Sequence, residues 1–349
     1  MIGYLAQAEG APCPTLVLPT STPLDDGPAL RAALTAARDW LTRTGRTHIM
    51  KIAFVAPSRH PLADLEFRFV QCLPGDGFDT EGNCGHSLAC ATLVAGNQGL
   101  TPLTPGEPVR VHVTNNDAHV VCETDRGPHH ETEMSLHFVH TPAPLLDSLL
   151  PTGNPVDELT AGPRTLRASL VTAGNPYVFV DARDLDLPDR PALFTAGESA
   201  LGELRALRAA AAELLGHPPT GAFPKIAAIG AYGPGPLAVR ALSVPAWHPT
   251  LALTGAVCLG VAVTLPGTLP ARLAPHHEPA GRHARRIELQ SPGGTRTVTV
   301  TTTDTPAGPA LTRTSVHGKR ARILTGPLPI PTALHETPKE ADLCLPPRT

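Results

Sequence analysis

The chain is poor in lysine and in aromatic residues, and it has no excess of basic charge. Aromatic residues make up 4% of its 349 positions, and the formal net charge at pH 7 is −3. A protein that binds the phosphate backbone of nucleic acid needs a strongly basic surface. The charge balance therefore argues against a nucleic-acid partner.

Long apolar runs are also missing. No stretch reaches the roughly 20 apolar residues of a membrane-spanning helix, and the first residues are not a basic segment followed by an apolar one. We therefore expect a cytoplasmic protein without a membrane partner.

Cysteines at the spacing of a zinc or redox motif are absent. The seven cysteines are odd in number, widely separated and never arranged as Cys-x-x-Cys. We expect reduced thiols rather than a disulfide framework or a metal site. Only four lysines occur, at positions 51, 225, 319 and 339, so each can be considered individually.

Proline and glycine, by contrast, are abundant. The 40 prolines and 31 glycines disfavour long helices, because proline removes a backbone donor and clashes inside a helix. Short strands are expected at His48–Pro57, Leu65–Val70, Val109–Thr114, Ala168–Ala173, Tyr177–Asp181 and Thr295–Thr303. Helical patterns cover Pro28–Leu41, Ser87–Ala95, Glu198–Leu215 and Gly255–Val263. Strands outnumber helices, which favours an α+β architecture.

A weak internal repeat divides the chain. Lys51-Ile52-Ala53 opens a strand, and another strand and the small-residue helix after Cys84 follow. Lys225-Ile226-Ala227 opens a second such series, which leads to the helix after Thr254. Coincidence is the alternative, because these short patterns are common.

The two helices of the repeat consist almost entirely of small and apolar residues. A helix of this kind has to be enclosed on all sides. If both helices are enclosed by curved sheets, their N-termini can face a cleft between two lobes, where free N–H groups attract an anion. The expected ligand of that cleft is a small carboxylate.

Several segments resemble, in order, the PrpF, methylitaconate isomerase and 4-oxalomesaconate tautomerase branch of the diaminopimelate-epimerase-like superfamily. The stretch KIAFVAPSRHPLADLEFRFVQ, which begins at Lys51, is similar to a Ser-Lys-Val-Ala segment of that branch, and Gly82–Gly85 matches its Asn-Cys-Gly motif. Further landmarks are Val109–Asn115, Leu150–Gly153, Ala173–Ala182, Pro224–Ile226, Thr254–Cys258, Pro266–Thr268 and Arg320–Leu324.

The resemblance implies an α+β, diaminopimelate-epimerase-like fold with two pseudo-symmetric lobes, each a curved antiparallel sheet around a central helix. Residues 1–160 plus 308–349 are expected to form the first lobe, with Lys51 and Cys84. Residues 161–307 are expected to form the second, with Lys225 and the helix start at Thr254. The stretch after Pro331 is expected to be a tail against the first lobe.

The resemblance also implies chemistry without a cofactor, in which a proton next to a carboxylate is removed and then returned. In the wider superfamily two cysteines flank the substrate, but the second is replaced here by Ala252. Inversion needs a base on one face and an acid on the other, whereas one base can move a proton along one face. We therefore expect an isomerase that moves a carbon–carbon double bond in a small unsaturated acid. The alternatives are an epimerase or racemase, and a non-catalytic protein that binds a small acid.

Three residues are candidate catalytic groups. Cys84 precedes a helix, where the dipole and free N–H groups favour the thiolate; the alternative is a structural cysteine. Lys51 matches the lysine of the branch, although Met50 replaces its serine, and a structural ion pair is the competing explanation. His86 stands where the family has asparagine, and could exchange protons with Cys84 or serve as a packing residue.

Candidate substrate-binding residues surround the two helix starts. Thr254 and Gly255 offer a hydroxyl and amides, or alternatively an ordinary helix cap. The full set is Asn83, Gly85, Ser87, Asn175, Thr254, Gly255 and Lys225. Cys258, about one turn into its helix, is expected in the core, and His248 is a secondary candidate.

The chain departs from the branch near its N-terminus, where an Arg-Gly-Gly-Thr-Ser-Lys-Gly segment is missing. That loop is expected to bind carboxylates in relatives, so a smaller or less acidic substrate is predicted. The composition, rich in proline, alanine and arginine, hints at specialised metabolite biosynthesis. A monomer or a homodimer is expected.

Overall fold

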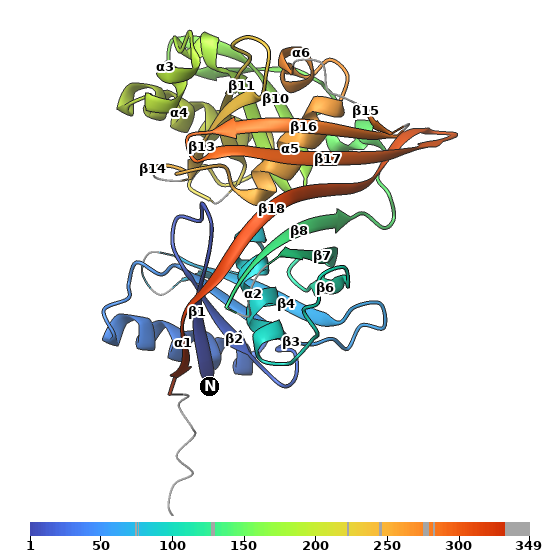
Figure 1. The fold of residues 1–349 in the computed structure, drawn as a ribbon. Coiled ribbons are helices and arrows are strands. Elements are labelled where there is room, and N and C mark those ends of the chain that lie inside the picture. Colours follow the sequence, from blue (N-terminus) through green and yellow to red (C-terminus); the bar gives the residue numbers. More distant parts are fainter. Residues whose placement is uncertain are drawn as a thin grey trace, which may run out of the picture.

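The computed structural model describes residues 1–331 except 74, 76, 127–129, 222, 244, 245, 275–278 and 282. The expected C-terminal tail lies outside the described residues. Two halves are stacked on each other, as Figure 1 shows. In the described part of the chain, no helix is both long and apolar enough to cross a membrane.

The first half contains two β-strands, a surface helix and then a second group of strands around a buried helix. Its elements are β1 (Ile2–Ala8), β2 (Thr15–Pro19), α1 (Pro28–Arg43), β3 (Lys51–Pro57), β4 (Leu65–Cys72), β5 (Phe78–Asp79), α2 (Gly85–Asn97), β6 (Val109–Val113), β7 (Ala118–Arg126), β8 (Glu131–Val139) and the short η1 (Leu146–Leu149).

The second half repeats this order with insertions. Its elements are β9 (Asp157–Ala161), β10 (Arg164–Ala173), β11 (Asn175–Asp181), η2 (Ala182–Leu185), α3 (Arg190–Thr195), α4 (Glu198–Leu214), β12 (Lys225–Gly230), β13 (Leu237–Ser243), β14 (Ala246–Trp247), α5 (Leu253–Thr264), α6 (Leu269–Leu273), β15 (Pro279–Gly281), β16 (Ala284–Ser291), β17 (Gly294–Thr305) and β18 (Gly308–Pro329).

Strand pairing shows the repeat most clearly. The parallel pairs β2–β3 and β4–β6 of the first half have counterparts in the parallel pairs β11–β12 and β13–β16 of the second. The remaining pairs are antiparallel, so the predicted antiparallel sheets also contain parallel pairs and the sheet is mixed. The α+β fold of two similar halves is confirmed.

Strand β18 belongs to both halves. It pairs with β17 up to Val316, and from Lys319 onward it pairs with β8 and β1. Gly318 lies between these two parts with a φ of 64°, a left-handed conformation that favours glycine. Residues 308–316 thus pair with the second half and residues 319–329 with the first. The lobe boundary at residue 308 therefore stays a prediction.

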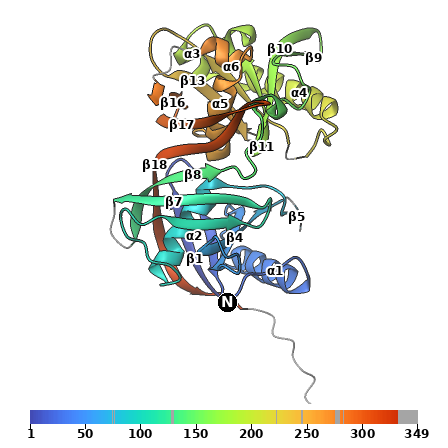
Figure 2. The same ribbon diagram turned by 90° about the vertical axis from the view of Figure 1, so that its right-hand side faces the viewer.

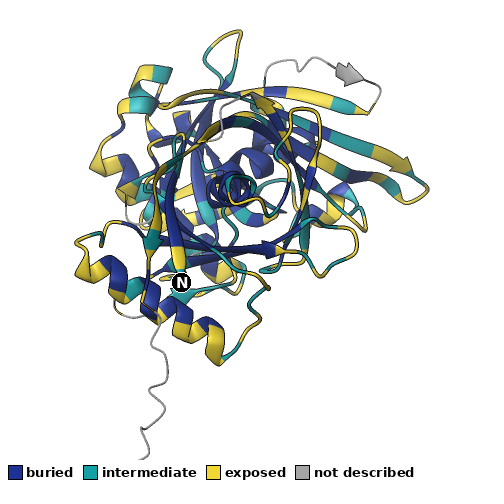
Figure 3. Ribbon diagram, turned by 60° about the horizontal axis from the view of Figure 1, so that its bottom comes forward, coloured by how far each residue is buried: buried dark blue, intermediate teal, exposed yellow. Residues whose placement is uncertain are grey.

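Helices α2 and α5 lie inside the curved sheets, as predicted. Every residue of α5 is buried, and α2 is buried from Gly85 to Ala95. Figure 3 shows a buried helix ringed by strands. Small side chains make this enclosure possible: a Cβ at Gly260 would come within 2.6 Å of Val298.

Amphipathic helices cover the outer faces of the sheets. Figure 2 shows α1 on the outside of one half and α4 on the outside of the other. In α1 the apolar residues Leu30, Leu34 and Leu41 are buried against the sheet, while the remaining face is largely exposed. Proline at the first position of α1 fits a helix start, because its missing N–H would be unpaired there.

All four predicted helices are confirmed, with ends that shift by up to two residues. Each of the predicted strands is present as well. The sequence reasoning did not identify the strands β1, β2, β5, β7, β8, β9, β14, β15, β16 and β18, nor the short helices α3 and α6.

Candidate active site

The N-termini of the two buried helices meet at the junction of the halves. Cys84 is the residue that precedes α2, and Ala252 is the residue that precedes α5. Gly85 packs directly against Leu253, since a Cβ at position 85 would lie 2.7 Å from a methyl carbon of that leucine. The repeat thus places Ala252 at the position in α5 that Cys84 occupies in α2.

Cys84 lies in surroundings that favour its thiolate. Burial alone would raise its pKa, but the positive charge of Lys51, the hydroxyl and N–H of Ser87, and the N–H of His86 together lower the pKa below its ordinary value. These N–H groups belong to the first turn of α2, where they have no partner within the helix. The side chain is half-buried. A partly accessible thiolate of this kind can act as a base.

Two of the predicted lysines act on this thiol. Lys51, the first residue of β3, is buried, and its charge lowers the pKa of Cys84. Lys225, the first residue of β12, is half-buried, and burial together with the nearby Arg208 lowers its pKa. Its ammonium lies 5.4 Å from the centre of the Phe223 ring and also interacts with Cys84 and Lys51. The structure therefore brings Lys51, Lys225 and Cys84 together.

A third lysine, which the sequence reasoning did not select, belongs to the same group. Lys319 is buried in β18, and burial and the charge of Arg296 lower its pKa to about 7. It interacts electrostatically with Cys84 and Cys90. Inward and outward positions alternate here: Lys319 and Ala321 are buried, while Arg320 is exposed. That alternation was the available signal, since one lysine among arginines took the inward position.

His86 and His248 form a stacked pair, with ring centres 6.1 Å apart and planes inclined by 13°. Burial and the charges of Lys319 and Lys51 hold the pKa of His86 well below its ordinary value. Burial and Lys51 likewise lower the pKa of His248 to about 4, and its Nδ1 accepts the N–H of Thr250. Both rings are therefore neutral at pH 7, and His248 carries its proton on Nε2.

Asn175 and Thr254 lie on the second-half side of the site. Asn175 opens β11 after a turn at Gly174, and its amide donates to the Thr254 hydroxyl at 3.3 Å. Thr254 also bonds the phenol of Tyr177, whose pKa is raised by burial. Gly255 packs against the same phenol. Thr254 lies in the first turn of α5 and is not its cap, which corrects the alternative explanation for this residue.

Asn83 and Ser87 complete the first-half side. The Oδ1 atom of Asn83 is buried and, within the described residues, has no hydrogen-bond partner. Ser87 is fully buried, and its hydroxyl lies 2.9 Å from that of Thr15. A buried acceptor without a partner is costly, so the Asn83 amide is a candidate for contact with a ligand.

The remaining buried thiols are part of the core. The Sγ of Cys258 lies 3.3 Å from the carbonyl oxygen of Val171, and burial raises its pKa to about 12, as expected for a packed cysteine. Burial also raises the pKa of Cys90 and Cys122 to about 12. No group of three or more His, Cys, Asp or Glu side chains in the described ranges is placed to hold a metal ion.

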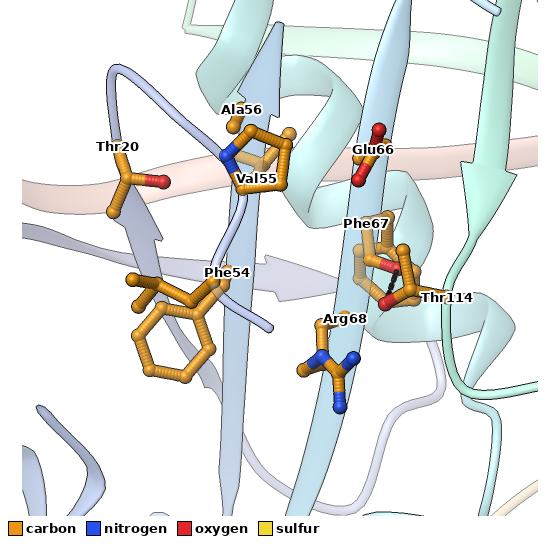
Figure 4. Close-up of a pocket in the computed structure, with 10 residues that line it drawn as sticks. Thr20, Phe54, Val55, Ala56, Glu66, Phe67, Arg68 and Thr114 are labelled. Carbon is orange, nitrogen blue, oxygen red and sulfur yellow. Dashed lines mark hydrogen bonds between the residues drawn. The ribbon is translucent and has the colours of Figure 1, made fainter. Parts of the chain in front are cut away.

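A separate small pocket lies at strands β3 and β4 and is lined by Glu66 and Arg68 (Figure 4). Its volume is about 10 Å³, which is room for about one water molecule. Arg68 pairs with Asp26 at 2.6 Å, and Glu66 accepts the N–H of Arg59. These contacts are those of a structural ion-pair network, and Lys51, Lys225 and Lys319 do not line this pocket.

Several named proteins are similar to this chain in sequence. The chain is 26% identical to the 3-methylitaconate isomerase of Eubacterium barkeri over 260 residues, which cover 63% of this chain and 68% of that protein. It is 27% identical to the (4E)-oxalomesaconate Delta-isomerase of Novosphingobium over 268 residues, which cover 70% of this chain and 72% of that one.

Solved structures share the fold. A methylitaconate-delta-isomerase matches with a TM-score of 0.66 at 20% identity over 93% of this chain and 94% of its own. A probable proline racemase from Agrobacterium radiobacter matches with a TM-score of 0.60 at 16% identity over 97% and 95%. The family model described as PrpF protein matches residues 43–331. The chain belongs to the PrpF family.

Proposed function

We propose that this protein is a cofactor-independent isomerase that moves a carbon–carbon double bond in a small unsaturated acid by proton transfer. The observation that carries the proposal is the asymmetry of the two helix starts. Cys84 precedes α2 with a lowered pKa, whereas Ala252 precedes α5 and has no titratable group. One thiol suffices to remove a proton from an allylic carbon and to return it along the same face.

The proton balance is simple. The Cys84 thiolate takes a proton from the carbon beside the double bond, and the C–H electrons shift toward the substrate carboxylate as a dienolate. The resulting thiol exchanges its proton with solvent and then protonates the other end of the conjugated system, which restores the thiolate. No redox partner is required.

The surrounding residues suit the charge that develops. Lys51 and Lys225 supply positive charge beside the thiol, and the first turns of α2 and α5 supply N–H groups. Such preorganised donors stabilise negative charge that grows in a transition state. Asn83, Gly85, Ser87, Asn175, Thr254 and Gly255 border the same place and are proposed to position the substrate.

His86 is proposed as a neutral group that contacts the substrate or relays the proton. With its pKa far below the ordinary value, it is uncharged at pH 7. Its Nε2 atom is buried and has no hydrogen-bond partner in the described part of the chain. A substrate oxygen or hydroxyl is a suitable partner for it.

The named relatives support double-bond movement over inversion. Their names are those of isomerases of methylitaconate and oxalomesaconate, both unsaturated acids. The likeness to a probable proline racemase shows the fold alone. Inversion would need a second acid opposite Cys84, and Ala252 cannot supply it.

The test is solvent exchange in D2O with a panel of small unsaturated acids. Wild-type protein is expected to incorporate deuterium, and Cys84→Ser is expected to lose at least about 100-fold in rate, the lower end for removal of a general base. Cys122→Ser is the matched control, because the Cys122 thiol contacts Thr92 in the core and its replacement should leave the exchange rate unchanged. An unchanged rate in Cys84→Ser would refute the proposal.

A further inference from the structure

His248 lies between β14 and α5, and hydrogen bonds hold both its backbone and its ring. Its N–H donates to the carbonyl oxygen of Ala241 in β13 at 2.9 Å. Its ring Nδ1 accepts the N–H of Thr250 at 3.1 Å. A neutral imidazole whose Nδ1 accepts a hydrogen bond carries its proton on Nε2. The second-half side of the site therefore presents a fixed N–H donor.

The segment that carries His248 is tied to the first half at Thr250. The Thr250 hydroxyl donates to the backbone oxygen of Gly10, which follows β1, at 2.8 Å. The backbone oxygen of the neighbouring Glu9 accepts the ammonium of Lys319. His248 is thus held at the junction where the two halves meet.

The Nε2–H of His248 is a buried donor that needs an acceptor. Among the described residues it has no hydrogen-bond acceptor, although the residue is only 6% exposed. Buried polar groups are almost always paired, and an unpaired one is costly. A ligand atom is therefore the expected acceptor.

The surroundings keep the ring neutral. Burial and the charges of Lys51, Lys319 and Lys225 lower the pKa of His248 to about 4. The ring of His86, which stacks on it with centres 6.1 Å apart, is also uncharged. A fourth positive charge among three ammonium groups would be repelled. His248 thus stays a neutral donor at pH values where an ordinary histidine becomes charged.

Through His86, His248 lies next to the segment that carries the thiol. The N–H of His86 helps to lower the pKa of Cys84, and the ring of the same residue stacks on His248. The Nε2 of His86 and the Oδ1 of Asn83 are buried and lack partners within the described part of the chain. A polar ligand beside Cys84 is therefore expected to meet unpaired groups from both halves.

We propose that His248 is a further catalytic residue, whose Nε2–H donates a hydrogen bond to a carboxylate oxygen of the substrate. The inference rests on the proposed function, because proton removal by Cys84 is what adds negative charge to that oxygen. A fixed neutral imidazole can stabilise such an enolate without giving up its proton. Both proton transfers stay with Cys84. The Nε2–H bond does not break, and the hydrogen bond strengthens as the dienolate forms.

NMR of wild-type protein with ¹⁵N-labelled histidines tests the donor directly. The His248 signal is identified by its loss in His248→Gln. It is expected to show a neutral ring protonated on Nε2 at pH 6, where an ordinary histidine is mostly charged. Millimolar crotonate, a small unsaturated acid, should shift this Nε2 signal. A ring that is charged at pH 6, protonated on Nδ1 or unaffected by crotonate would overturn the proposal.

Rates of solvent exchange test the catalytic role. With an acid that wild-type protein exchanges, His248→Phe should lower kcat about 100-fold, the loss expected when one donor to developing charge is removed, and change KM less than about threefold. His248→Gln keeps an oxygen for the Thr250 N–H and an N–H for the substrate, so it should recover most of the rate. Equal rates in His248→Phe and wild type, or an equal loss in both variants, would overturn the proposal.

His119→Phe is the matched control. The ring of His119 lies beside those of His60 and His112, with centres 5.0 and 5.2 Å away, and belongs to β7. Its replacement should leave kcat and KM at their wild-type values.

The outcome is separable from that of the proposed function, because the NMR experiment does not require turnover. A protein that never exchanges protons, but in which crotonate shifts the Nε2 signal of His248, would contradict the isomerase and leave the donor intact. Exchange that survives His248→Phe would leave the isomerase intact and remove His248 from the reaction.

Discussion

Replacing Lys319 by methionine should stabilise the protein at low pH. The pKa of Lys319 is about 7, against an ordinary value of 10.5. At about 1.4 kcal/mol per pH unit, this difference corresponds to a cost on the order of 4–5 kcal/mol for the buried charge below pH 7. Methionine removes that cost but leaves the Glu9 carbonyl without its donor, a loss of about 1–3 kcal/mol. The net gain in the free energy of unfolding at pH 6 should be about 1–4 kcal/mol.

The sign of the pH dependence follows from proton linkage. Between pH 7 and 10.5 the unfolded chain keeps the lysine proton while the folded protein has lost it, so wild-type stability rises with pH in that window. The variant lacks this contribution, and its advantage should shrink to near zero at about pH 9.5. Urea unfolding of both proteins at the two pH values measures the difference. An advantage of equal size at both pH values, or none at pH 6, would show that the buried charge of Lys319 does not destabilise the protein.

Three other changes test parts of the site. In Lys51→Met, the pKa of Cys84 should rise because the positive charge that lowers it most is gone. The midpoint of iodoacetamide alkylation against pH should therefore move upward, whereas Lys51→Arg should keep the wild-type midpoint. Identical midpoints in all three proteins would contradict the role of Lys51. Gly85→Ala should cost about 1–3 kcal/mol in urea unfolding, because its Cβ would meet Leu253 at 2.7 Å; Gly202→Ala, whose Cβ meets nothing within 4 Å inside α4, is the control and should be neutral or stabilising. Thr254→Val should remove the hydrogen-bond partner of the Asn175 amide and the Tyr177 phenol. It should weaken the binding of crotonate, an unsaturated monocarboxylate, without lowering the rate of Cys84 alkylation. An unchanged crotonate affinity would show that Thr254 does not bind the substrate.

The sequence predicted that Cys84 stands at a helix start, and the structure agrees, because the signals for this position are local. Cys84 stands in a short motif immediately before a helix of small residues, and both features are visible in one stretch of chain. The composition of α2 and α5 also predicted their burial, since a helix without a polar face cannot lie at a surface.

The position of Lys319 at the site could not be predicted from a local motif, because it depends on the pairing of strands that are distant in sequence. It reaches the site only because β18 leaves β17 at Gly318 and joins β8 and β1, at the far end of the sequence. Its strand, KRARIL, carries three charges and gives a weak strand pattern. The same reason hid β1 and β2, whose segment contains several prolines and pairs with strands distant in sequence.

The sequence indicated the importance of Ala252 but not the contacts of Thr254. Ala252 was recognised through the missing cysteine, and the structure places it just before α5, where Cys84 stands before α2. The contact of Thr254 with Asn175 spans β11 and α5, so no local pattern indicated it.

In the proposed reaction, a single thiol moves a double bond and does not invert a stereocentre. The most direct measurement is proton NMR of an unsaturated acid that the protein accepts, incubated in D2O until equilibrium. Deuterium is expected at the far end of the conjugated system together with a shifted double bond, and both changes should disappear in Cys84→Ser. Deuterium at an unshifted position with inversion of configuration would contradict the proposed reaction.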